Sequence, residues 1–467
     1  MSHNEDFDFD NGEFSALLEK CEQTFATGNE VYFDVDEFIR LIDYYIEQDS
    51  AKDKMQKLFA YAEKQHGFNS DIASLKAVSL IDYDRADEAL LIYHKLFTLE
   101  PDNALHAADL SFTYAHLGDI SNMLFYLKRA IALNPEEEEN AVCYICSELL
   151  LHAHNDAALK ILEETRCKFP ENTEILFLLG RCCNALENHK KSIEVFQALL
   201  RLKPYSCDSW FSLGAAYMFS DQFDEAIEAL DYALAIDADF IEAYFVKAAC
   251  LADSDNMQAA IETFEEVIQR KPNHIEALES LVDCYFELND LEQAENYLRR
   301  MIDIEPDFAR VWAKLAHINA HNGNHKQAIT LFQKALELEP DNCTIIMDFA
   351  TLLSALNIND AAIALSKQAL KLEKCDDEIW LKYSEILRNN NEPNKAIEIL
   401  QRAITYIQTA PLYYTLAELF VEQKKFDKAL EYFAIAHAED SSMTECFFEN
   451  CTLPSDKLEL FHSILHK

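Results

Sequence analysis

Apolar residues recur along this chain in a pattern that repeats every 34 residues. The clearest copy is residues 207–240, where one apolar stripe at helical spacing runs from Trp210 to Tyr217 and a second runs from Ala226 to Ala233. A short polar break separates the two stripes. The pattern predicts two helices joined by a turn, which is a helical hairpin.

The hairpin pattern is copied through most of the chain. Steps of 34 residues, with a last step of 33, connect the alanines Ala226, Ala260, Ala294, Ala328, Ala362, Ala396 and Ala429. The same step connects the positions at which hairpins end, which are Pro170, Pro204, Ala238, Pro272, Pro306 and Pro340. A fixed period of this length indicates a solenoid, because each hairpin buries its apolar face only against its neighbours. Counting in this period gives about twelve hairpins, with one extra residue in 138–172 and one fewer in 377–409.

The repeats divide the chain into three parts. We expect an acidic tail and an N-terminal capping helix in residues 1–35, the repeat array in residues 36–443, and a degenerate half-repeat with a C-terminal capping helix in residues 444–467. Asp34 and Glu37 are spaced as in a capping box, which predicts that a helix begins there.

The residues that recur in each unit resemble the tetratricopeptide repeat, a 34-residue hairpin with Trp, Leu, Gly, Tyr, Ala, Phe, Ala and Pro at fixed positions. Position 8 is small in nine units: Ala77, Ser111, Gly180, Gly214, Ala248, Ala316, Ala350, Ser384 and Ala417. Position 20 is also Ala in nine units. The resemblance implies an all-α, right-handed superhelical solenoid whose hairpin helices cross closely at position 8. It is strongest to acidic bacterial proteins built almost wholly of such units.

Three units depart from the repeat and are the expected sites of irregular packing. The repeat 36–69 has Asp43 at the small position, and the unit 138–172 has Ile145 there. The unit 377–409 has Gln408 in place of Pro near its end. A larger or charged side chain at a close helix crossing requires the packing to change.

The balance of charge changes the picture of possible partners. Forty Lys and Arg against 83 Asp and Glu give a formal net charge of −43, which repels phosphate backbones and anionic lipid. We therefore expect a protein or peptide partner, with basic segments favoured, and no nucleic acid, membrane or small-molecule substrate. The first residues carry no pattern of a secretory signal, so we expect a cytoplasmic protein.

Thirteen cysteines are present, but their spacing matches no paired metal motif. Cys182, Cys250 and Cys284 fall at one repeat position where a small buried residue is required. Cys143 and Cys146 form a single CxxC inside a predicted helix, for which a structural role is favoured over a redox role. No cofactor is expected.

Aromatic residues recur at position 5 of three consecutive units, as Phe177, Phe211 and Phe245. Met218 and Phe219 follow in the middle unit. In tetratricopeptide arrays this position faces the concave surface, so the resemblance implies an aromatic ladder that anchors a peptide. The same three side chains could instead fill the seam between adjacent hairpins. The sequence leaves both interpretations open.

A second candidate site combines His317 and His321 with Glu279, Asp283 and Glu287 of the preceding unit. Histidines four residues apart with carboxylates opposite could hold a divalent metal ion, although solvated polar residues in a groove are more common.

Acidic residues at position 2 of eight units offer a groove edge that would attract a basic segment. They are Glu37, Asp71, Glu139, Glu174, Asp208, Glu242, Glu276 and Glu378. Position 2 lies in the first helical turn, where the helix dipole alone favours carboxylates and explains most of the pattern.

The sequence predicts a non-catalytic scaffold that binds protein segments on its concave face. A metal-responsive binding protein using the histidine cluster is the alternative. An enzyme is disfavoured, because the chain contains no phosphate loop, nucleophile elbow or metalloprotease helix.

Overall fold

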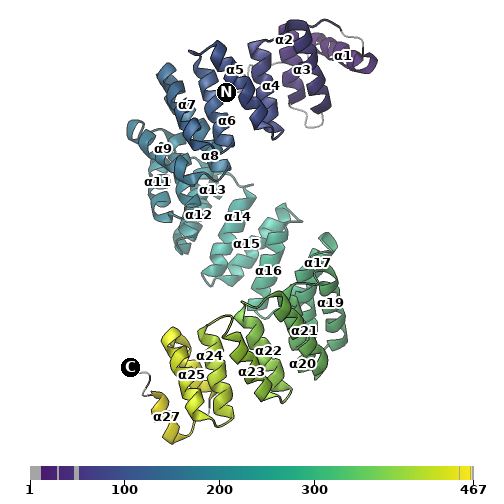
Figure 1. Cartoon of the computed structure of the whole chain (residues 1–467), viewed down its shortest axis with the longest axis vertical. Coiled ribbons are helices and arrows are strands. Elements are labelled where there is room, and N and C mark those ends of the chain that lie inside the picture. Colours follow the sequence, from purple (N-terminus) through teal and green to yellow (C-terminus); the bar gives the residue numbers. More distant parts are fainter. Residues whose placement is uncertain (1–11, 29–30, 47–51, 452, 463, 465–467) are drawn as a thin grey trace. The chain divides into compact units, whose positions relative to one another are not determined.

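The computed structural model describes residues 12–28, 31–46, 52–451, 453–462 and 464 (Figure 1). The predicted acidic tail, residues 1–11, lies outside this range. Within the described residues the chain forms 27 α-helices and two short 3-10 helices, with no strand, so the predicted all-α class is confirmed. The chain divides into two compact units, Met1–Ser254 and Asp255–Lys467.

Both units are built from helices of similar length. The helices of the first unit are α1 Gly12–Thr27, α2 Val35–Ile46, α3 Lys52–His66, α4 Ser70–Asp82, α5 Ala86–Leu99, α6 Ala104–His116, α7 Ile120–Leu133, α8 Glu138–Leu151, α9 Asn155–Lys168, α10 Thr173–Ala185, α11 His189–Leu202, α12 Cys207–Met218, α13 Phe223–Ile236 and α14 Ile241–Asp253, with the 3-10 helix η1 Pro135–Glu137 before α8. The helices of the second unit are α15 Met257–Arg270, α16 Ile275–Glu287, α17 Leu291–Ile304, α18 Ala309–His321, α19 His325–Leu338, α20 Cys343–Ala355, α21 Asn359–Leu372, α22 Asp377–Asn389, α23 Pro393–Ala403, α24 Ala410–Glu422, α25 Phe426–Glu439, α26 Thr444–Asn450 and α27 Ser455–His462, with the 3-10 helix η2 Ser441–Met443 before α26.

Consecutive helices pack in pairs, as the 34-residue period predicts. In the first unit the pairs run from α2 with α3 to α12 with α13, and in the second unit from α16 with α17 to α24 with α25. Each pair also packs against the next, for example α11 against α12 and α13 against α14. The stack of hairpins expected from the sequence is confirmed in each unit.

The two helices of a hairpin cross at the small residue of position 8. A Cβ added to Gly180 would lie 2.6 Å from the ring of Phe196, and one added to Gly214 would lie 2.8 Å from Leu230, so no larger side chain fits. Serine also fits, because the Ser111 hydroxyl donates a hydrogen bond of 3.0 Å to the carbonyl of Met123 on the facing helix. All nine position-20 alanines are fully buried: Ala89, Ala158, Ala226, Ala260, Ala294, Ala328, Ala362, Ala396 and Ala429.

The turn inside each hairpin has one backbone geometry. Eleven residues at corresponding positions of the repeat have a positive φ between 55° and 75°: Asp84, Gly118, Ala153, Glu187, Asp221, Asp255, Asn289, Gly323, Asn357, Asn391 and Lys424. Two hydrogen bonds close the turn at Glu187, from its own amide to Asn184 and from Asn188 to Cys183, each 2.9 Å. This is a Schellman ending of the first helix, in which glycine is the least strained residue.

Polar contacts fix the start of several first helices. Asn69, Asn172 and Asn342 occupy the last position of their units, and each accepts a hydrogen bond from the first turn of the next helix. The indole of Trp210 donates a 2.8 Å bond to the carbonyl of Pro204, and Trp312 makes the same contact with Pro306. The repeated Trp and Pro therefore join one hairpin to the next.

The predicted caps are present at both ends. Asp34 and Glu37 accept hydrogen bonds from each other's backbone amides at 2.8 and 3.0 Å, which confirms the capping box. α1 buries Phe14 and Cys21 against α2 and α3. At the other end, the ring of Phe461 on α27 lies 5.2 Å from that of Phe433 on α25. The exact division into three parts stays a prediction.

Two of the departing units differ locally in their helices. The 3-10 helix η1 ends at Glu137, immediately before α8 begins the unit 138–172, which has the extra residue. The shortened unit 377–409 has an α23 of 11 residues, against 14 residues in α21.

The strained turn provides a test of the hairpin geometry. We expect Glu187→Gly to stabilise the first unit by about 0.5–1 kcal/mol, because glycine adopts the positive φ without the cost that a side chain incurs. Glu194→Gly, at an exposed position inside α11, should instead destabilise it by about 1 kcal/mol. Thermal and urea unfolding of both variants measure the difference, and a loss of stability in Glu187→Gly would refute the assigned turn.

Candidate protein-binding surface

The first helices of successive hairpins lie side by side. In the first unit α6 packs against α8, α8 against α10, α10 against α12, and α12 against α14. We call the surface that they share the first-helix face of the first unit. In the second unit α18, α20, α22 and α24 form the corresponding surface, the first-helix face of the second unit.

The three predicted ladder residues lie on successive first helices, Phe177 on α10, Phe211 on α12 and Phe245 on α14, and all are half-buried. The ring of Phe177 meets Phe196 of its own hairpin edge-on at 6.1 Å. The ring of Phe211 lies 4.9 Å from that of Phe240, the last residue of its repeat and the residue directly before α14. Phe177 and Phe211 thus each pack on a second ring while part of each side chain stays accessible, and the choice between peptide anchor and seam residue stays open.

Met218 and Phe219 lie near the end of α12. Met218 is half-buried and packs against the core of its hairpin. Phe219 is 61% exposed and its ring stacks on His189 of the preceding hairpin at 5.3 Å. Eight residues of helix separate Phe219 from Phe211, or about 12 Å, so Phe219 belongs to the turn end of the face.

Two aromatic residues that sequence reasoning missed extend this surface. The rings of Phe112 on α6 and Tyr144 on α8 stack at 4.6 Å with 19° between their planes, and Tyr144 is 46% exposed. They occupy other repeat positions than the Phe ladder, so a search at position 5 alone did not find them. A search for aromatic residues on every first helix would have done so.

Carboxyl groups lie beside the aromatic pair. Burial raises the pKa of Asp109, on α6, to about 7. Burial and the negative charge of Asp109 raise the pKa of the Tyr144 hydroxyl to about 12. The Asp109 carboxyl thus acts on the Tyr144 hydroxyl across a partly buried surface, and its negative charge, when it is ionised, makes this part of the face favourable for positive charge.

The first-helix face of the second unit is lined by ion pairs. Arg310 on α18 lies 3.5 Å from Glu279 on α16, and Lys314 pairs with Asp283 in the same way one turn further along. Asp348 on α20 accepts from His317 at 3.2 Å and from Lys382 at 3.1 Å. Burial opposes ionisation of Asp348, but His317 and Lys382 outweigh it and lower its pKa.

The ion pairs involve three of the five residues of the predicted histidine cluster. Glu279 and Asp283 are engaged by Arg310 and Lys314, and the ring of His317 faces Asp348. Glu287 and His321 are exposed. The carboxylates of Glu279 and Asp283 are thus held in ion pairs with basic side chains of α18, and metal binding by this cluster stays a prediction.

The position-2 acids lie in first helical turns, as the dipole explanation requires. Glu174 is in the first turn of α10, and Glu37 serves in the capping box. Their arrangement gives no separate support for a basic groove edge.

The buried cysteines are structural. Cys182, Cys250 and Cys284 are at most 4% exposed, as expected for their shared repeat position. Burial raises the pKa of Cys143 to about 12, and it also raises that of Cys146. Thiols held in the protonated form are poor nucleophiles, which supports the structural interpretation of the CxxC.

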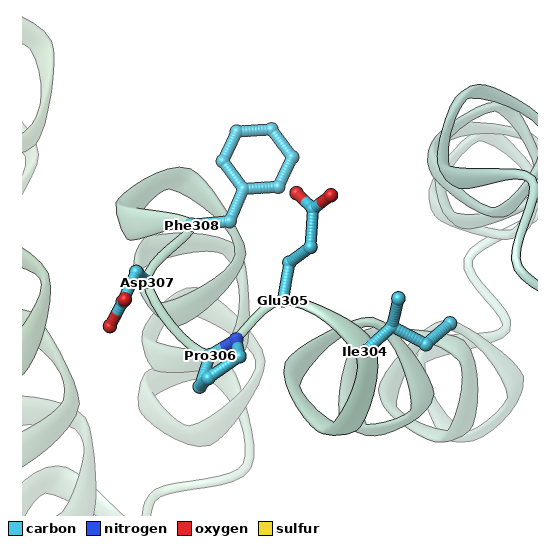
Figure 2. Close-up of a pocket in the computed structure, with 5 residues that line it drawn as sticks. All are labelled: Ile304, Glu305, Pro306, Asp307 and Phe308. Carbon is cyan, nitrogen blue, oxygen red and sulfur yellow. The ribbon is translucent and has the colours of Figure 1, made fainter. Parts of the chain in front are cut away.

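A hollow of about 390 Å³ lies over the turn between α17 and α18 (Figure 2). It is lined by Ile304, Glu305, Pro306, Asp307 and Phe308. Figure 2 shows Glu305 and Phe308 pointing to one side of the turn and Asp307 pointing away. A single chain segment with diverging polar groups does not form a ligand site.

Comparison with known proteins identifies the class of the chain. Models of the tetratricopeptide repeat match residues 149–206, 211–275, 251–318, 309–342 and 377–409. Over these residues the chain consists of tetratricopeptide repeats. Proteins built of this repeat generally act as non-catalytic scaffolds for protein interactions. In the described residues no helix is both long and apolar enough to cross a membrane.

Individual relatives match only part of the chain or match it distantly. The tetratricopeptide repeat-containing protein trd-1 of Caenorhabditis elegans is 27% identical over 132 residues, which is 28% of this chain and 16% of that protein. Among solved structures, MamA is 23% identical and covers 36% of this chain and 97% of its own, with a TM-score of 0.34. Yeast Tom70 is 15% identical and covers 92% of this chain and 96% of its own, with a TM-score of 0.46.

The buried carboxyl on the first-helix face predicts a pH dependence. The folded-state pKa of Asp109 is about 7, above the value of about 3.9 for an unfolded chain, so the folded protein loses stability as pH rises from about 4 through about 7. We expect Asp109→Asn to stabilise the first unit by about 1–2 kcal/mol at pH 8 and to have no effect near pH 4. Urea unfolding at both pH values measures this. The exposed Asp307→Asn is the control, and a pH-independent effect of Asp109→Asn would contradict the assignment.

Proposed function

We propose that the first-helix face of the first unit binds a protein segment that carries apolar anchors and basic residues. The observation that carries this proposal is an aromatic side chain on each of five consecutive first helices, from Phe112 on α6 to Phe245 on α14. Large aromatic residues with partly exposed rings are the usual anchors of protein interfaces, because they bury much area with little loss of conformational entropy.

The rings are held before any partner arrives. Phe211 rests on Phe240, Phe177 on Phe196, and Phe112 on Tyr144, at distances between 4.6 and 6.1 Å. A ring that is already packed on one side loses little freedom on binding, so this support favours affinity. Neighbouring first helices are roughly 10 Å apart, a distance that a segment of a few residues bridges.

Charge adds a preference for basic segments. The net charge of −43 attracts cationic partners over a distance, and Asp109 lies beside the aromatic pair on α6 and α8. The first-helix face of the second unit differs, since ion pairs such as Arg310 with Glu279 engage its charged groups. The aromatic surface of the first unit is therefore the better candidate for an apolar anchor.

We also propose that the protein works in the cytoplasm. All thirteen cysteines are unpaired, which suits a reducing compartment. Cell fractionation followed by immunoblotting tests this, and recovery in an oxidising compartment would refute it.

Replacing one anchor tests the surface directly. Peptides are selected from a random display library on the full chain and titrated against Phe211→Ala. We expect binding to weaken by about 1–3 kcal/mol, with a loss of folding stability of about 1–2 kcal/mol because the ring also contacts Phe240.

Phe125→Ala is the matched control for this experiment. Phe125 is 63% exposed and lies on α7, a second helix, so its removal should leave peptide affinity unchanged. Equal losses in both variants, or a fall in melting temperature of Phe211→Ala without any change in affinity, would remove the aromatic residues from the binding surface.

Salt dependence tests the electrostatic part separately. The association rate of a selected basic peptide should fall as salt rises to physiological strength, where the Debye length is about 8 Å. Stopped-flow measurements over a salt series give this slope. A rate that does not change with salt would refute steering by the negative field and leave the aromatic anchor standing.

A further inference from the structure

Two histidines and a buried glutamate converge in the first unit, where Glu148 lies one turn of α8 beyond Tyr144. The Nδ1 atom of His116 lies 2.8 Å from Oε1 of Glu148, and the Nε2 atom of His152 lies 2.9 Å from the same oxygen. The two imidazole rings are 4.5 Å apart. Among the described residues, this is the one group of three potential metal ligands whose ligand atoms all lie within 4.8 Å of one another.

The fold explains why these side chains meet. His116 is the last residue of α6, and α6 packs against α8 as the neighbouring first helix. Glu148 and His152 are four residues apart at the end of α8, so they lie on one side of the helix one turn apart. The arrangement joins two consecutive hairpins at the ends of their first helices.

Glu148 is an unusual residue for its place in the repeat. Counted back from the positive-φ residue of the turn, the equivalent positions of the neighbouring hairpins hold Thr113 and Cys182, yet here a carboxylate is only 8% exposed. A buried carboxylate costs free energy unless it is paired. Its partners are the imidazoles of His116 and His152, and both rings donate a hydrogen bond to the same oxygen, Oε1 of Glu148. A stable core did not require a carboxylate here, because small uncharged residues occupy this position in the neighbouring hairpins.

The three ligand atoms suit a divalent transition metal ion. Two histidines and a glutamate form one of the ligand sets that zinc uses when a fourth position stays open. An ion about 2.1 Å from each atom would separate tetrahedral ligand atoms by about 3.4 Å, so the hydrogen-bonded atoms need to part by roughly 0.5 Å. His116 and His152 are partly exposed, with 20% and 32% of their side chains accessible, which provides an entry path for the ion and for a fourth ligand.

The surroundings favour a cation. Asp82, the last residue of α4, is close enough to His116 for the two charges to interact. We propose that His116, Glu148 and His152 bind one divalent transition metal ion of the zinc class, with water or a partner side chain as the fourth ligand. The ion would tie the hairpin 104–137 to the hairpin 138–172.

The test uses untagged full-length protein that has been treated with a chelator. Titration with Zn²⁺ by calorimetry should show one equivalent per chain with a dissociation constant in the micromolar range or below. His116→Asn and His152→Asn should each weaken binding at least tenfold. His325→Asn, at an exposed histidine of the second unit, is the matched control and should bind as the parent protein does.

Spectroscopy on the unsubstituted protein keeps the test independent of how well the variants fold. Cu²⁺ bound at this site should show electron paramagnetic coupling to two imidazole nitrogens, and Co²⁺ should show the visible bands of a low-coordinate site without thiolate charge transfer. Zn²⁺ should also raise the melting temperature of the parent protein but not of His152→Asn. Binding that the histidine substitutions leave unchanged, thiolate bands from cysteine coordination, or no saturable binding would each overturn the proposal.

Discussion

The close approach of two helices within each hairpin is the constraint on which the rest of the structure depends. Gly180 and Gly214 leave space for Phe196 and Leu230 of the facing helix, and a single added carbon would clash at less than 3 Å. Since the crossing occurs at the same position of each hairpin, the two helices pack against each other with similar geometry throughout each unit. Successive hairpins then stack in register and bury a continuous core.

The turn is the second device that keeps the hairpins alike. A residue with positive φ ends the first helix in eleven hairpins, although only Gly118 and Gly323 among them are glycines. The other side chains adopt the strained backbone because packing of both helices determines the turn. Regular turns place the first helices side by side, and this is how residues 34 apart come to share one surface.

That shared surface has different chemistry in the two units. In the first unit, Phe112, Phe177 and Phe211 present partly exposed rings, each supported by a second aromatic side chain. In the second unit, Asp348 and Lys382 belong to a chain of ion pairs that satisfies charges within the face. A repeat scaffold thus keeps its core positions fixed while the exposed positions of the first helices vary, which is where specific binding can differ from one array to another.

The sequence by itself determined the hairpins, their number and their order. Core packing requires small residues at a fixed spacing, and this spacing is visible in the sequence without knowledge of any contact. The sequence also predicted the capping box at Asp34 and the burial of Cys182, Cys250 and Cys284. Only the tertiary structure decided which polar groups meet. In the tertiary structure Glu279 and Asp283 form ion pairs with basic residues of α18, the next first helix. His116 and Glu148 also come into contact only there. Such pairings depend on side-chain direction and on the offset between neighbouring helices, and neither is encoded in the spacing of residues along the chain.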